Sequence, residues 1–205
     1  MRLDRPLDDL FPSGSHVKVL RALAAVPEGI GFSTREVARR AGISHPTASN
    51  VLEGLRRQGV VVVRRTPWAD EFAVNPDHVL WGRIRPLLRW DRRARDEVVR
   101  ALADGIGRHA PWVRAAWLFG SAARDEMQPD SDLDVALIVP KARTARTKEA
   151  MEALAEETSL AFGNRLNSLV GSRPIEQLIR SASPGYRLWR VIAREGIPLI
   201  APEGG

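Results

Sequence analysis

The segment LFGSAARDEMQPDSDLDVALIV, residues 118–139, decides the fold of the C-terminal part of the chain. Two apolar runs, residues 113–119 and 133–139, bound its polar middle, and short apolar runs of this kind are typical of buried strands. The polar middle predicts a loop and a short helix. Asp132 and Asp134 stand at the start of the second run, and residues two apart share one face of a strand.

These two aspartates and the turn before them indicate phosphate chemistry. Two carboxylates held close together repel each other, and a divalent cation that binds both removes the repulsion. Gly120 and Ser121 follow the first run, and glycine lets backbone N–H groups approach a phosphate closely. The combination predicts phosphoryl or nucleotidyl transfer. The alternative is that Asp132 and Asp134 simply begin an ordinary strand.

The order of these residues resembles the signature of the DNA polymerase beta-like nucleotidyltransferase superfamily, in particular its minimal nucleotidyltransferase branch. Gly-Ser is followed, after ten intervening residues, by Asp-Leu-Asp. Arg124 and Ser131 also match. The resemblance implies a small mixed sheet with flanking helices. It also implies that this domain binds a nucleoside triphosphate with Mg²⁺, and ATP is the nucleotide we expect. By position it assigns the following candidates: Gly120, Ser121, Arg124 and Ser131 to the nucleotide, and Asp132 and Asp134 to Mg²⁺ and catalysis. For Arg124 the alternative is a solvated surface arginine.

One position departs from this pattern. Active members of the superfamily usually carry a third carboxylate on a later strand, beside the first two. The candidate strand, residues 164–170, offers Asn167 and Ser168 there. Asparagine can give a hard cation one neutral oxygen but no charge. The sequence therefore predicts nucleotide and metal binding and leaves open whether the domain catalyses transfer.

Composition limits the class of protein. The chain has 205 residues, of which 44% are hydrophobic, and its apolar runs are far shorter than a membrane span requires. The N-terminus lacks the basic start and apolar core of a signal peptide. Cysteine is absent, which excludes disulfides and thiolate metal sites. We expect a soluble, cytoplasmic protein of one large or two small domains.

The net charge of +6 is unevenly distributed along the chain. Residues 1–110 carry 19 Lys and Arg against 13 Asp and Glu, whereas residues 111–205 carry 12 of each. A basic half beside a neutral half favours an anionic polymer as the partner of the first half. The alternative is a solvated basic surface without a partner.

Two short helices separated by a tight turn are predicted between Ser33 and Gly59. Ser33 and Glu36 have the spacing of a capping box, and Gly42 suits the left-handed end of the first helix. Ser44 is a good N-cap for the second helix, which leaves small polar residues outside its apolar stripe. This arrangement is typical of helix-turn-helix DNA readers.

A β-hairpin, residues 60–65 and 71–74, follows the second helix and carries arginines near its loop. The pattern over residues 32–75 resembles the winged helix-turn-helix domains of bacterial regulators such as the MarR and ArsR groups. That resemblance implies binding of double-stranded DNA, with these positional candidates for contacts: His45, Thr47, Ser49, Asn50, Arg57, Arg64 and Arg65. The alternative is a winged helix that docks another protein.

Residues 76–109 read as basic helix with an interruption at Pro86. An apolar stripe at intervals of four runs through this segment: Trp90, Ala94, Val98 and Leu102. Such a stripe needs a partner surface. It either packs the two domains together or forms a homodimer, the form in which helix-turn-helix proteins commonly read paired half-sites.

The remaining elements complete an α+β chain. A helix over residues 145–162 leads to the strand at 164–170, helices follow at 174–180 and 184–195, and residues 196–200 form an edge strand. The predicted architecture is an N-terminal winged helix-turn-helix joined by helices to a C-terminal nucleotidyltransferase fold with a mixed β-sheet. The expected divisions are residues 1–80, a connector at 81–109, and 110–205.

Three functions remain open at this stage. The first is a transcriptional regulator whose second domain binds or transfers a nucleotide with Mg²⁺. The second is an enzyme that modifies a protein, such as a toxin, or a small molecule, with the winged helix as its docking module. The third is a catalytically silent regulator that keeps the fold.

Overall fold

The computed structural model describes residues 11–91, 93–124, 126–128, 130–180 and 186–201. The chain divides into two compact units, Met1–Ala94 and Arg95–Gly205, which are described separately below. Pro184, expected in the first turn of the last helix, lies outside the described residues.

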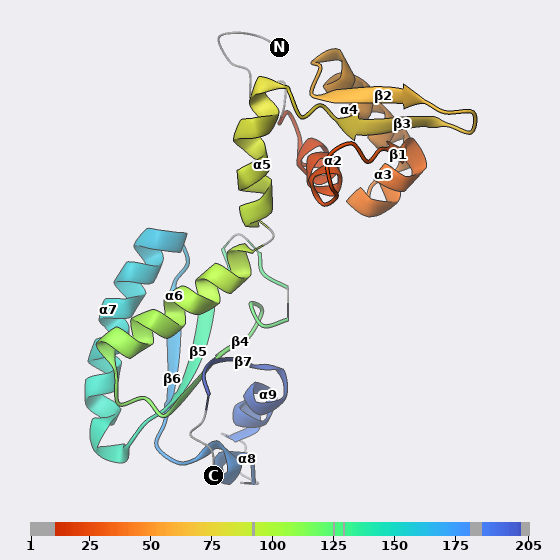
Figure 1. The fold of residues 1–205 in the computed structure, drawn as a ribbon. Coiled ribbons are helices and arrows are strands. Elements are labelled where there is room, and N and C mark those ends of the chain that lie inside the picture. The colour runs from red at the N-terminus through yellow and green to blue at the C-terminus, as the bar shows by residue number, and fades with distance from the viewer. Residues whose placement is uncertain (1–10, 92, 125, 129, 181–185, 202–205) are drawn as a thin grey trace. The chain divides into compact units, whose positions relative to one another are not determined.

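The described part of the first unit is a helix-turn-helix with a small antiparallel sheet and two further helices (Figure 1). Its elements are α2 (Gly14–Ala24), β1 (Phe32–Ser33), α3 (Thr34–Ala41), α4 (His45–Arg57), β2 (Val61–Arg65), β3 (Asp70–Val74) and α5 (Val79–Asp91). Leu20, Leu52, Leu55 and Trp81 are among its largest fully buried side chains. The core therefore joins α2, α4 and α5.

The capping residues read from the sequence set the helix-turn-helix geometry. Ser33 Oγ accepts a hydrogen bond from the Glu36 N–H at 3.3 Å, and Gly42 ends α3 in the left-handed conformation with φ 61°. Ser44 Oγ caps α4 in the same way, accepting from the Thr47 N–H at 3.3 Å. The Glu36 carboxylate does not complete the capping box as predicted. It accepts hydrogen bonds from Arg39 and Arg40, which lower the pKa of Glu36 to about 2.

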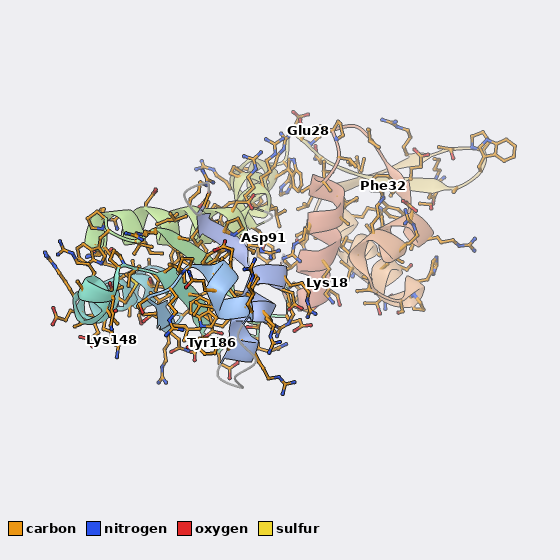
Figure 2. All side chains as sticks on the ribbon, turned by 90° about the horizontal axis from the view of Figure 1, so that it is seen from below. Lys18, Glu28, Phe32, Asp91, Lys148 and Tyr186 are labelled. Carbon is orange, nitrogen blue, oxygen red and sulfur yellow. The ribbon has the colours of Figure 1, made fainter. Side chains whose placement is uncertain are left out.

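A third strand, not predicted from the sequence, completes the wing. β1 pairs with β3, with Phe32 opposite Phe72, so the strand order is β1-β3-β2. The Arg40 guanidinium lies 4.3 Å from the ring centroid of Phe32, which is labelled in Figure 2. β1 thereby ties the start of α3 to the hairpin.

α5 runs through Pro86 without the predicted interruption. Trp81, Ile84 and Leu88 are buried on both sides of the proline and hold the helix against α2. Proline has no N–H group, so the carbonyl of Gly82 lacks its helical hydrogen-bond partner at Pro86. Gly82 and Pro86 are both exposed, so water can hydrogen-bond to that carbonyl.

Two ion pairs join α5 to α2 and to the segment between α2 and β1. Asp91, labelled in Figure 2, accepts a hydrogen bond from Arg21 Nε of α2 at 2.6 Å, and Arg85 pairs with Glu28. α5 therefore belongs to the first unit. The segment 81–109, expected as a connector, is divided between the two units.

The second unit is a four-stranded mixed sheet covered by helices on both faces (Figure 1). Its elements are α6 (Ala94–His109), β4 (Ala115–Phe119), β5 (Leu133–Ile138), η1 (Lys141–Arg143), α7 (Thr144–Phe162), β6 (Leu166–Gly171), α8 (Ile175–Arg180), α9 (Arg187–Glu195) and β7 (Ile197–Ile200). The strand order is β6-β5-β4-β7, with β5 and β6 parallel and the other pairs antiparallel. These elements confirm the predicted α+β class, and β7 is the predicted edge strand.

Alternation along the strands divides the apolar residues between two cores. Leu118, Val135 and Leu137 face α6 and α7, together with Leu102 and Leu154. On the other face, Trp117, Ala136 and Ile138 pack against Trp189 and Ile192 of α9. Both faces of β5 are therefore dry beyond its first residues, and polar side chains gather where the strand begins.

The predicted stripe from Trp90 to Leu102 does not lie on one helix. α5 ends at Asp91 and α6 begins at Ala94, so Trp90 belongs to the first unit. Leu102 is buried in the core of the second unit, with Val98 packed beside it. No helix within the described ranges is both long and apolar enough to cross a membrane.

Candidate functional site

The polar start of β5 brings three side chains to one point. Asp132 directly precedes β5, and Asp134 is its second residue, opposite Phe119 of β4 and Asn167 of β6. Asn167 Nδ2 donates hydrogen bonds to Asp132 Oδ2 and to Asp134 Oδ1, both at 3.1 Å. The two carboxylates and the amide therefore converge, as the alternation of the strand predicted for the aspartates.

Gly120 lies directly against this group. Its φ is +74°, and a Cβ atom at this position would stand 2.4 Å from Asp134 Oδ2. The backbone conformation favours glycine here, and a Cβ atom would make the Asp134 carboxylate turn away from its present position. The turn after β4 and the carboxylate of β5 are thus packed against each other.

The segment after Gly120 is a turn, not the predicted short helix. The Ser121 carbonyl accepts hydrogen bonds from the N–H groups of Arg124, at 3.2 Å, and Glu126, at 3.0 Å. No helix lies between β4 and β5 in the described part of this segment. Glycine at its start and the bonds to a single carbonyl favour a turn over a helix.

The side chain of Arg124 is held by carboxylates. Its Nε atom donates to Glu126 Oε2 at 2.8 Å, and its Nη1 atom lies 3.9 Å from Glu195 Oε2. The hydrogen bond to Glu126 is the main cause that raises the pKa of the Arg124 guanidinium. The predicted contact with a triphosphate would therefore have to use the remaining N–H groups of Arg124 or break the bond to Glu126.

Ser131 shapes the loop that leads to the aspartates. Its Oγ accepts from the Gln128 N–H at 2.8 Å, and its N–H donates to the Gln128 carbonyl at 3.0 Å. Asn164 Nδ2 donates to the Ser131 carbonyl at 2.9 Å. The loop is thus tied to the segment before β6.

A cleft of about 430 Å³ opens beside Asp132, within the usual size range of small-molecule sites. It is lined by Asp130, Ser131, Asp132, Gly163, Asn164 and Arg165. The cleft therefore adjoins the converging carboxylates and has one basic side chain in its wall.

In the first unit, most of the predicted DNA contacts are exposed on α4 and β2. His45, Ser49, Asn50 and Arg57 are exposed on α4, and Arg64 and Arg65 are exposed on β2. Thr47 differs, because it is half-buried and its hydroxyl lies 2.7 Å from Ser44 Oγ. Thr47 therefore takes part in capping α4.

The wing ends in a closed turn. The Thr66 N–H and hydroxyl both donate to the Ala69 carbonyl, at 3.1 and 2.6 Å, and the Ala69 N–H donates back to Thr66 Oγ1 at 3.1 Å. Trp68 stands on this turn with 94% of its surface exposed. A large apolar side chain is thus presented to solvent at the tip of the wing.

Comparison with known families agrees with this geometry. Residues 12–67 match the MarR family, and residues 105–175 match the polymerase beta nucleotidyltransferase family. The chain joins a MarR-like winged helix to a nucleotidyltransferase domain. The second match contains Gly120, Asp132, Asp134 and Asn167.

Among solved structures, the chain is similar to one described as the crystal structure of the toxin-antitoxin with AMP-PNP. The identity is 18% over 51% of this chain and 74% of the other, with a TM-score of 0.36. No curated protein matches the chain.

Two residues of interest escaped the sequence reasoning. Arg165 of the nucleotidyltransferase domain lies in the cleft wall. It directly precedes β6, the strand parallel to β5, and this position in the sequence could have identified it. Trp68 of the MarR-like winged helix stands at the wing tip, where an apolar residue in an otherwise polar loop is the signal.

The residues of the nucleotidyltransferase domain fit a hard divalent cation. Mg²⁺ is usually bound by one or two carboxylates, with water and substrate phosphates as its other ligands. Asp132 and Asp134 supply two carboxylates, and the donor group of Asn167 bridges them at the place a cation would take. The described residues bring no third carboxylate or imidazole to this point.

We expect Gly120→Ala to destabilise the nucleotidyltransferase domain more than Gly163→Ala. Gly163 also has a positive φ, of +75°, but a Cβ atom there meets nothing within 4 Å. Both substitutions carry the left-handed cost of about 1–2 kcal/mol. Only Gly120→Ala adds a contact with Asp134 Oδ2, and turning this carboxylate away breaks its hydrogen bond with Asn167, at a further cost of about 0.5–1.5 kcal/mol. Urea unfolding followed by circular dichroism measures the difference, and equal losses would show that the close approach is not constraining.

Proposed function

We propose that this protein is a DNA-binding regulator whose nucleotidyltransferase domain binds a nucleoside triphosphate together with Mg²⁺. The nucleotide that we propose is ATP. The observation that carries the proposal is the convergence of Asp132, Asp134 and Asn167 beside the Gly120 turn. The cleft next to Asp132 is large enough for part of a nucleotide. Arg165 in its wall supplies a positive charge for the phosphates.

In nucleotidyl transfer, the residues of this site would bind and orient the triphosphate. The Gly120–Ser121 turn would hold phosphate oxygens, and Asp132 and Asp134 would hold Mg²⁺. Asn167 could add its neutral oxygen after its amide, whose Nδ2 now faces both carboxylates, turns over. Bound Mg²⁺ neutralises phosphate charge. An acceptor hydroxyl then forms a bond to the α-phosphorus, pyrophosphate leaves, and the hydroxyl proton passes to an aspartate carboxylate or to water.

The MarR-like winged helix supports double-stranded DNA as the partner of the first unit. α4 exposes Ser49 and Asn50 at its start, where helix-turn-helix proteins contact base edges. Arg57, Arg64 and Arg65 are exposed and suited to phosphates. We propose that the protein acts in the cytoplasm and binds DNA as a homodimer, because helix-turn-helix proteins commonly read paired half-sites.

A second candidate function is a silent regulator that binds the nucleotide without transferring it. Asn167 favours it, because an amide adds no charge and accepts no proton from an acceptor. A third, transfer to a protein acceptor such as a toxin, shares the same nucleotide site and differs only in the acceptor.

We expect ATP to bind in a Mg²⁺-dependent way, and Asp132→Asn/Asp134→Asn to abolish the dependence on Mg²⁺. The double variant removes both charges that hold the cation but keeps the shape of the side chains. Titration calorimetry of ATP, with and without Mg²⁺, measures this, and Asp104→Asn on the exposed side of α6 is the control. Unchanged Mg²⁺-dependent binding in the double variant would remove these aspartates from the nucleotide site.

Asn167→Asp distinguishes a transferase from a silent regulator. We expect the third carboxylate to tighten Mn²⁺ binding by about tenfold or more, because affinity for hard cations rises with the number of charged ligands. Titration followed by electron paramagnetic resonance measures the affinity. If wild-type protein incorporates no labelled nucleotide into any acceptor and Asn167→Asp does, the missing charge keeps the domain silent. Nucleotide transfer by the wild-type protein would exclude the function of a silent regulator.

We expect Arg57→Gln to weaken DNA binding and to lower the salt dependence by about one counterion. The matched control is Arg56→Gln, because the adjacent Arg56 is already paired with Glu53 at 2.7 Å. Fluorescence anisotropy with a duplex selected from a random pool, measured over a range of salt concentrations, gives both slopes. Identical slopes for the two variants would argue that α4 does not lie along the phosphates.

A further inference from the structure

A second pocket lies in the nucleotidyltransferase domain, where β4 begins and β5 ends. Its volume is about 320 Å³, at the lower end of the range for small-molecule sites. The residues that decide its chemistry are Arg114, Trp117, Ile138, Arg173, Ile175 and Glu176. They come from the starts and ends of the central strands and from the segment that leads into α8.

This pocket is separate from the nucleotide cleft. Asp134, Ala136 and Ile138 alternate along one face of β5, so the pocket and the carboxylates share that face. Four residues of strand between Asp134 and Ile138 correspond to about 13 Å. Trp189 and Ile192 of α9 belong to the same apolar core as Ala136 and Ile138 on this face. A molecule bound in the pocket therefore does not reach the carboxylates.

The inner wall of the pocket is apolar and partly aromatic. Trp117 and Ile138 are only 7% and 6% exposed, and Ile175 adds a third apolar side chain from α8. Only a small part of the indole and of the isoleucine faces the pocket, and a flat hydrocarbon group would exclude water from that part.

The rim of the pocket carries an excess of positive charge. Arg114 and Arg173 are exposed, and no ion pair is found for either within the described residues. Glu176 is the acidic residue on the same rim, so two guanidinium groups and one carboxylate leave a net charge of +1. This balance favours an anionic ligand over a neutral one.

The geometry points to a second ligand site that takes a small aromatic carboxylate, with its ring on Trp117 and Ile138 and its charge against Arg114 and Arg173. The site does not depend on the proposed nucleotide function, because it uses none of the same residues. Its ligand would contact α8, which covers the face of the sheet that carries Asp134.

Calorimetric titration of the full chain with 1-naphthoate tests the site, with 1-naphthamide as the neutral probe of equal shape and 1-naphthyl phosphate as the dianion. We expect one saturable site for 1-naphthoate and at least about tenfold weaker binding of the amide, because a hydrogen bond to a charged group contributes about that factor. The phosphate should compete with 1-naphthoate for the same site, because two guanidinium groups can also pair with phosphate oxygens. Mg²⁺ and ATP should not displace 1-naphthoate.

Arg114→Gln and Arg173→Gln should each weaken 1-naphthoate by about tenfold. Arg180→Gln is the matched control, because Arg180 is exposed on α8 outside the pocket. Glu176→Gln should strengthen binding, because it removes the negative charge of the rim. The site is refuted by any of these results: no saturable binding, equal binding of the amide, displacement by ATP, or arginine variants that bind like the wild-type protein.

Discussion

The repulsion between Asp132 and Asp134 is the constraint on which the nucleotidyltransferase domain is built. The alternation of β5 aims both carboxylates at one point, and the amide of Asn167 donates a hydrogen bond to each. This arrangement requires β5 and β6 to be parallel and in the register that sets Asp134 opposite Asn167. It also favours glycine at position 120, because a Cβ atom there would displace the Asp134 carboxylate from its present position. Strand pairing, turn and site are thus one unit.

The parts of the fold that depend on neighbouring residues were predictable from the sequence. The caps formed by Ser33 and Ser44, the left-handed Gly42 and the alternation around Asp134 each involve groups a few residues apart. Local chemistry alone decides such features, so short segments of the sequence are enough to predict them.

The features that the sequence did not reveal depend on distant partners. β1 has two residues, too few to show alternation, and it exists because Phe72 of β3 lies opposite Phe32. Pro86 reads as a helix breaker, but burial of Trp81 and Leu88 against α2 keeps α5 continuous. The sequence placed Asn167 on the correct strand, yet its bonds to both aspartates could be seen only once the register of β5 and β6 was known.

The position of β6 has a consequence for the size of molecule that can approach the site. β6 forms one edge of the four-stranded sheet, so Asn167 and the carboxylates lie near a side that no further strand of the described residues covers. A site enclosed within a wide sheet admits only what passes through a narrow mouth. A site on an edge strand sets no such limit on one flank, so a folded macromolecule can approach it as readily as a metabolite.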